Sequence, residues 1–167
     1  HEEQLRDQGR DTVGVWGIRP EAKDVVIGAA LVSKECTLLV VGENGVGKRT
    51  PFDDEKGPVY RKQSRGGKGI ITMKTGDKTG RVVGALTVTD NDELMLITTK
   101  GQMVRTRVKE IRAVGRNTMG VKLMDLKGAE KLQAIAPVVS QAGEESEVET
   151  VPEGSKRARI LRCALPW

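Results

Sequence analysis

The stretch LLVVGENGVGKRT, residues 38–50, returns 56 residues later as LMLITTKGQMVRT, residues 94–106. Each copy has an apolar run, a turn with glycine at the same place (Gly45 and Gly101) and a second run that ends in Arg-Thr. Apolar runs joined by a short glycine-containing turn are typical of β-hairpins. The sequence therefore predicts the same β-hairpin written twice.

The first copy also resembles a phosphate-binding loop, because Gly42, Gly47 and Lys48 have the spacing that such a loop needs. However, Arg49 stands where a Ser or Thr would bind Mg²⁺, and the following residues show no helical period. The second copy lacks the Gly-Lys pair. We therefore favour the hairpin over a nucleotide site and expect that ATP with Mg²⁺ does not raise the melting temperature.

Two further elements recur around the hairpin. Each copy of a glycine element keeps an arginine, a glycine four residues later and then a β-branched residue, and a run of small and apolar residues follows it. The glycine elements are GRDTVGV, SRGGKGI and GRNTMGV at 9–15, 64–70 and 115–121, and the small-residue runs lie at 27–32, 83–88 and 133–138. The unit is therefore a glycine loop, a strand, a small-residue strand and a hairpin, with a period of about 51–56 residues.

Repeats of this length with several short strands favour an all-β, propeller-like fold, because one small sheet buries its faces only against its neighbours. Residues 1–139 would form roughly two and a half blades, with repeats near 1–34, 35–90 and 91–139. Because a closed ring needs about four blades or more, we expect a partial ring from a larger domain. A compact β-sandwich is the alternative. Residues 140–167 lose the repeat and predict a disordered acidic tail with an atypical basic and apolar end.

The composition offers little for catalysis or metal binding. The 167-residue chain has one histidine and two distant cysteines, which argues against a zinc site. The acidic runs at residues 53–55 and 90–93 are interpreted as turns, because the first lies in a proline-flanked loop and the second lacks the glycine and the final glutamate of a calcium loop. No catalytic, cofactor-binding or metal-ligating residue is therefore predicted. An apolar run of about 18 residues and a signal segment are both absent from the sequence. We therefore expect a cytoplasmic protein without membrane contact.

The net charge of +5 comes from basic residues that gather in the turns and loops of the repeat. Such a distribution suits a polyanionic partner, although it also fits a solvated surface or a site for an acidic protein. Aromatic residues make up only 2% of the chain, too few for the stacking platforms of single-strand binders, so duplex DNA is the favoured partner. The candidate residues are Lys48, Arg49, Arg61, Lys62, Arg65, Lys68, Lys74, Lys100, Arg105, Arg107, Lys109, Arg112 and Arg116.

Several separated motifs together resemble the C-terminal domain of the DNA gyrase A subunit. They are NGVGKRT, QSRGGKG, VVGALTV, ELMLITTKGQMVRTRVKEI and VGRNTMGV, and the likeness runs from about residue 8 to 139. The resemblance implies the late blades of a β-pinwheel whose basic rim wraps duplex DNA and supports ATP-dependent negative supercoiling. It also implies a heterotetramer of two gyrase A and two gyrase B subunits in a bacterial cytoplasm, with ATP and Mg²⁺ used elsewhere in the holoenzyme. The C-terminal domain of the topoisomerase IV A subunit is the nearest alternative.

The family's signature heptapeptide, Gln-Arg-Arg-Gly-Gly-Lys-Gly, is matched at six positions. Here it reads Gln63, Ser64, Arg65, Gly66, Gly67, Lys68 and Gly69, with Ser64 in place of an arginine. The resemblance makes the six matching residues candidate DNA contacts, while the glycines alone would also suit a tight loop with positive φ. The family's catalytic tyrosine belongs to a region without a counterpart here. Tyr60 is therefore not predicted to be a nucleophile, and the chain is not expected to be active alone.

Overall fold

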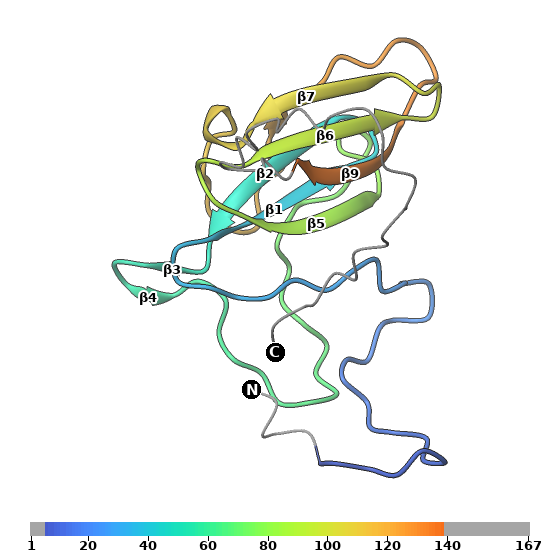
Figure 1. Cartoon of the computed structure of the whole chain (residues 1–167), viewed down its shortest axis with the longest axis vertical. Coiled ribbons are helices and arrows are strands. Elements are labelled where there is room, and N and C mark those ends of the chain that lie inside the picture. The colour runs from blue at the N-terminus through green and yellow to red at the C-terminus, as the bar shows by residue number, and fades with distance from the viewer. Residues whose placement is uncertain (1–5, 139–167) are drawn as a thin grey trace, which may run out of the picture.

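A computed structural model describes residues 6–138 of the chain, and these residues form two β-sheets and a small hairpin (Figure 1). The described part contains no α-helix, only a 3-10 turn, η2 (Val108–Glu110). The all-β fold expected from the repeat is therefore confirmed. The acidic tail predicted for residues 140–167 lies outside the described residues.

The first sheet has the order β5-β1-β2-β8. Strands β1 (Thr37–Gly42) and β2 (Val46–Pro51) form the expected antiparallel hairpin, in register from Thr37 opposite Pro51 to Val41 opposite Gly47. Gly45 closes the turn with a φ of 74° and donates its N–H to the Gly42 carbonyl at 3.1 Å. A glycine is needed there because side chains with a Cβ rarely adopt such a φ.

The second sheet has the order β7-β6-β9 and repeats the same hairpin. Strand β6 (Glu93–Thr98) pairs with β7 (Met103–Arg107), and Gly101 takes a φ of 79° in the turn. The hairpin prediction is thus confirmed for both copies. Strands β1 and β6 also share a register shift at their last residue, where each meets the third strand of its sheet.

Each hairpin is completed by the small-residue strand that follows it in the chain. Strand β5 (Val82–Val88) pairs antiparallel with β1, and β9 (Leu132–Val138) pairs antiparallel with β6. The two sheets meet where β5 approaches β9: a Cβ added at Gly84 would lie 2.7 Å from the Ile135 side chain. Small residues in this strand therefore permit the close contact between sheets.

The strand expected at residues 27–32 does not form. Strands β5 and β9 each pair with the hairpin that precedes them in the chain. A strand at residues 27–32 would need a hairpin before it in the same way, and residues 6–26 contain no such hairpin. Its backbone makes a contact at Leu31, whose carbonyl accepts a hydrogen bond from the Thr87 hydroxyl at 2.7 Å. Leu31 and Val32 remain largely exposed, and in Figure 1 the blue segment before β1 runs away from both sheets.

One apolar core joins the two sheets. It is built from residues of β1, β5, β6 and β9 and of the segments that follow β7 and β8 (Val121–Lys122). Its members are Leu39, Val41, Val88, Leu94, Leu96, Val108, Ile111, Met124 and Leu132. Burial of these side chains supplies the main stabilisation, at roughly 25 cal/mol per Å² of apolar surface.

A short hairpin of β3 (Asp53–Asp54) and β4 (Gly57–Pro58) stands apart from the sheets (Figure 1). It follows closely on β2, and Asp53, Asp54 and Glu55 expose acidic side chains along it. Across residues 6–138, the structure holds no helix long and apolar enough to cross a membrane.

Candidate nucleic-acid interface

The three glycine elements lie in one row because the segment that follows each one pairs with the next. Ile18 forms a parallel bridge with Gly67, supported by hydrogen bonds from Gly66 N–H to the Gly17 carbonyl at 3.0 Å and from Arg19 N–H to the Gly67 carbonyl at 3.1 Å. This contact joins the first element to the second.

The second junction repeats the first. Met73 forms a parallel bridge with Thr118, Lys74 N–H donates to the Thr118 carbonyl at 3.0 Å, and Asn117 N–H donates to the Thr72 carbonyl at 3.0 Å. The segment after the first element thus pairs with the second element, and the segment after the second pairs with the third.

The six-of-seven heptapeptide match forms the exposed second element of this row. Arg65 and Lys68 are exposed, whereas the backbone at Gly66 and Gly69 takes φ values of 70° and 85°. A Cβ on Gly67 would lie 2.9 Å from the Gln63 amide oxygen. The glycines therefore have a structural role in the turn, and the two cations extend to solvent, where a phosphate can reach them. Arg61 and Lys62 precede this element and are exposed as well.

Lys48 does not face solvent, contrary to the prediction that it contacts DNA. Its side chain is 0% exposed within β2. The Nζ donates hydrogen bonds to the Gly115 carbonyl at 2.7 Å and to the Thr118 hydroxyl at 3.0 Å. Burial and, to a lesser degree, the Arg116 guanidinium lower the pKa of this ammonium. The correction follows from the third glycine element, which covers β2 and accepts the hydrogen bonds that a phosphate would otherwise accept.

Arg49 is also buried and its role as a direct DNA contact is likewise corrected. Its Nε donates to the Ile111 carbonyl at 2.5 Å, and its guanidinium forms an ion pair with Asp90. Its backbone carbonyl accepts a hydrogen bond from Val114 N–H at 2.9 Å. Arg49 therefore fastens the segment after β7 to β2. Since Lys48 lies in a strand of a hairpin, the first copy of the repeat does not have the backbone of a phosphate-binding loop.

The candidate cations of the second hairpin are exposed, but two of them share an acidic neighbour. Arg105 and Arg107 have exposed side chains and both pair with Glu93, Arg107 at 3.7 Å. Lys100 is exposed in the turn. The ion pairs with Glu93 reduce the positive potential of β7, whereas Lys100 keeps its charge open to solvent.

Arg116 is exposed in the third glycine element and lies over an aromatic ring. Its guanidinium carbon is 5.9 Å from the centre of the Tyr60 ring, and Tyr60 packs against Phe52 with ring centres 5.8 Å apart. The Tyr60 hydroxyl hydrogen-bonds the Thr72 hydroxyl. Tyr60 therefore holds the junction between loops and supports Arg116.

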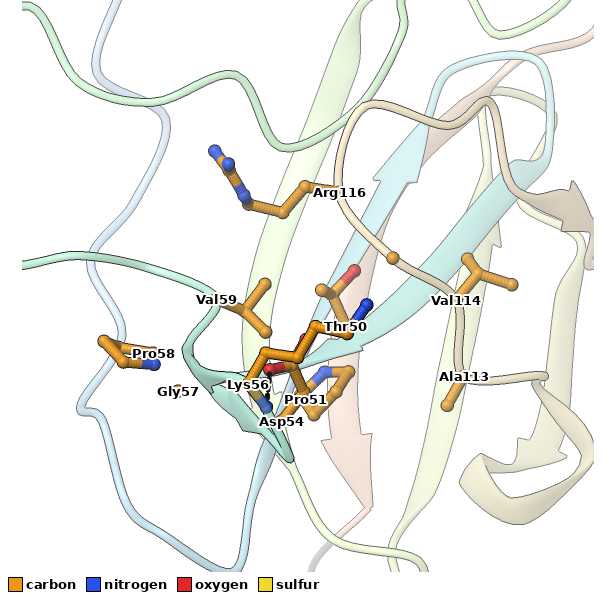
Figure 2. A pocket seen from close by; sticks show the side chains of 11 residues that line it. Thr50, Pro51, Asp54, Lys56, Gly57, Pro58, Val59, Ala113, Val114 and Arg116 are labelled. Atoms are coloured by element: carbon orange, nitrogen blue, oxygen red, sulfur yellow. Dashed lines mark hydrogen bonds between the residues drawn. The ribbon is translucent and has the colours of Figure 1, made fainter.

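A cavity beside this loop was not apparent in the sequence. It has a volume of about 630 Å³ and lies between the β3–β4 hairpin and residues 113–116 (Figure 2). Lys56 reaches across it toward Thr50, and Arg116 lies at its other wall (Figure 2). Its walls are more than fifty residues apart in the chain, so no local pattern reveals it. Asp54 also lines it, which weakens it as a site for phosphate.

The part of the chain that the structure describes contains no candidate metal site. No group of three or more His, Cys, Asp or Glu side chains is placed to hold an ion among residues 6–138. What the described surface offers is a row of glycine loops with exposed Arg and Lys side chains, which is chemistry for binding a polyanion.

Comparison with known proteins identifies the fold. The sequence model of the family described as "DNA gyrase C-terminal domain, beta-propeller" matches residues 1–33, 37–89 and 92–138. The chain belongs to this family. Its two described sheets, each a hairpin completed by the next small-residue strand, accordingly form a partial β-pinwheel, as the repeat predicted.

Relatives of the gyrase family cover most of this chain. The DNA gyrase A subunit of Helicobacter pylori is 46% identical over 125 residues, which are 74% of this chain and 14% of the relative. The chain thus spans about a seventh of the length of that protein. A solved structure of a DNA gyrase A C-terminal domain matches with a TM-score of 0.70 and 26% identity, over 81% of this chain and 45% of the other.

A C-terminal domain of DNA topoisomerase IV has the same fold. Its crystal structure also matches with a TM-score of 0.70, at 21% identity, over 82% of this chain and 42% of the other. Structural likeness alone does not separate the gyrase and topoisomerase IV branches. Sequence relatives such as the gyrase A subunit of Helicobacter pylori, at 46% identity, favour the gyrase branch.

Proposed function

We propose that the chain is a duplex-DNA-binding part of a DNA gyrase A subunit, which wraps DNA around its basic glycine loops. The observation that carries the proposal is the exposure of Arg65, Lys68 and Arg116 on adjoining glycine elements of a gyrase-family fold. Contacts of arginine and lysine with phosphate oxygens do not depend on the base sequence, and bent duplex DNA is held by many such contacts.

In the holoenzyme, wrapping serves ATP-dependent negative supercoiling. The A subunit carrying this domain pairs with gyrase B subunits and with a second copy of itself, and ATP and Mg²⁺ act on those other parts. The support is the family membership and the 46% identity to a gyrase A subunit. The chain's own task is to bind DNA, not to cleave it or hydrolyse ATP.

The first test measures the affinity of the full chain for a duplex at a series of salt concentrations. Each phosphate contact contributes a slope of about −0.9 to log K against log[salt], so several contacts give a steep line. Replacing Arg65 and Lys68 together by alanine removes two contacts and flattens the slope by about 1.8. The loss of affinity is expected to be similar for duplexes of different sequence.

The matched control is Lys127→Ala, which removes one exposed charge outside the predicted contacts. It is expected to leave the slope nearly unchanged. A flat salt dependence of the unaltered chain contradicts DNA binding, and a loss confined to one duplex sequence argues for base readout instead of phosphate contact.

The gyrase assignment is tested in the reconstituted holoenzyme that carries this domain. Negative supercoiling of relaxed plasmid with ATP is the expected result. Relaxation and decatenation without negative supercoiling would instead assign the chain to topoisomerase IV, whose C-terminal domain shares the fold.

A further inference from the structure

The third glycine element is fastened to β2 by a small cycle of hydrogen bonds. Lys48 Nζ donates to the Gly115 carbonyl at 2.7 Å and to the Thr118 hydroxyl at 3.0 Å. The Thr118 hydroxyl in turn donates to the same Gly115 carbonyl at 3.0 Å. These contacts bring the two ends of the four-residue stretch 115–118 together, and Arg116 lies inside it.

Packing alone does not account for a lysine at this position. Within residues 6–138, no carboxylate forms an ion pair with Lys48, and its two acceptors are neutral. Burying an ammonium without an opposite charge is costly, and an apolar side chain fills such a place more cheaply. In the second copy of the hairpin the corresponding residue, Val104, is exposed on β7. The partners that the structure gives this ammonium both belong to the loop at residues 115–118.

The opposite side of the loop is fastened by two backbone hydrogen bonds. Asn117 N–H donates to the Thr72 carbonyl and Lys74 N–H donates to the Thr118 carbonyl, both at 3.0 Å. Asn117 has a φ of 54°, in the left-handed region that asparagine adopts more readily than most other residues with a Cβ. The backbone on both sides of Arg116 is thus held in one conformation.

We propose that Lys48 is a positioning residue that fixes residues 115–118 so that Arg116 projects toward a DNA phosphate, without touching the DNA itself. The inference rests on the proposed duplex binding. Lys48 holds the loop that carries Arg116 in place before DNA binds. An arginine that is already held in place loses less conformational entropy when it binds. Lys48 and Arg116 then act as one unit.

The test uses the full chain and four variants. Lys48→Met keeps the length of the side chain and removes the ammonium, and Thr118→Val removes the hydroxyl while Lys48 stays in place. Arg116→Ala removes the proposed contact, and Lys127→Met is the charge-matched control. Because Thr118 is exposed, its substitution does not disturb the core and serves if Lys48→Met fails to fold.

The first readout is amide hydrogen exchange at Asn117 and Val114. Hydrogen bonds to a charged donor are worth enough to speed local opening about tenfold when they are lost. We therefore expect exchange at Asn117 to accelerate about tenfold in Lys48→Met and less in Thr118→Val, and to be unchanged in Lys127→Met. Unchanged exchange in both of the first two variants overturns the positioning role.

The second readout is a double-mutant cycle on duplex affinity. Arg116→Ala is expected to weaken binding several-fold, and Lys48→Met to weaken it by a similar or smaller factor. In the double variant the two losses should not multiply, because Lys48 acts through Arg116. Fully multiplicative losses, or no loss with Arg116→Ala, overturn the inference. If replacing Arg65 and Lys68 still lowers the duplex affinity in that case, the proposed function stands. If the unaltered chain does not bind the duplex, or if none of these replacements changes its affinity, the proposed function fails as well.

Discussion

The hairpins β1–β2 and β6–β7 share a sequence pattern and differ in what lies beside their second strand. Strand β2 is covered by β8 and by the third glycine element, so Lys48, Arg49 and Thr50 are buried. Strand β7 is an edge strand among the described residues, and Met103, Val104 and Arg105 are exposed. The burial of residues 48–50 is therefore decided by a glycine loop more than sixty residues away in the chain and not by the hairpin itself.

The largest difference is expected between Leu39 and its copy, Met95. Leu39 is fully buried in the shared core, whereas Met95 is half-buried. Leu39→Ala should lower the free energy of unfolding by about 3–4 kcal/mol and Met95→Ala by about 1 kcal/mol, since the cost follows the cavity left behind. Urea denaturation of both variants measures the two values. Equal losses would mean that the two hairpins are equally covered.

The turn glycines give the next contrast. Gly45 and Gly101 have nearly the same positive φ, but a Cβ on Gly45 would lie 2.7 Å from the Met124 carbonyl oxygen, and a Cβ on Gly101 would meet nothing within 4 Å. Gly45→Ala should cost about 2–3 kcal/mol, from strain and a clash, and Gly101→Ala about 1 kcal/mol, from strain alone. Thermal unfolding of the two variants under one condition ranks them. A larger loss for Gly101→Ala would be incompatible with the covered turn.

The two arginines at the ends of the hairpins come third. Arg49 donates to the Ile111 carbonyl in a buried site, and Arg105 pairs with Glu93 on the surface. Arg49→Met should cost about 2 kcal/mol because a buried carbonyl loses its donor, and Arg105→Met about 0.5 kcal/mol or less. Denaturant midpoints at constant m-value provide the comparison. Little change in the Arg49 variant would place that side chain in solvent.

The smallest effect is a pH dependence that belongs to the covered hairpin alone. The pKa of Lys48 is lowered in the folded chain from its ordinary value of 10.5, first by burial and then by Arg116. The unfolded chain therefore binds more protons between the two pKa values, and this group makes stability rise with pH across that window. The rise should disappear in Lys48→Met and persist in Lys127→Met. Stability curves that stay parallel between wild type and Lys48→Met at alkaline pH would contradict the lowered pKa.

Local sequence predicted those parts of the fold that depend on neighbours in the chain. Both hairpins and their turn glycines follow from apolar runs around Gly45 and Gly101, and the structure confirms them. The strand expected at residues 27–32 failed because its pairing depends on a hairpin that precedes it. A run of small residues indicates a strand but does not say which hairpin completes it.

The candidate site shows the same limit. The exposure of Arg65 and Lys68 follows from glycine-rich turns, which the sequence displays directly. The burial of Lys48 does not, because its partners Gly115 and Thr118 are 67 and 70 residues away. From the sequence alone, a basic residue in a strand such as Lys48 is expected to face solvent. Only the position of the loop that covers it shows that it is buried.

Lysine reactivity, mapped by mass spectrometry with and without duplex DNA, separates the buried cation from the exposed ones. Without DNA, an amine-acylating reagent should modify Lys68 and Lys127 rapidly and Lys48 slowly, because Lys48 is buried and the other two are exposed. Duplex DNA should then slow the modification of Lys68 and leave Lys127 unchanged. Rapid modification of Lys48 in the folded chain, or a Lys68 rate that DNA does not change, would contradict the division between a buried cation that positions a loop and exposed cations that bind phosphate.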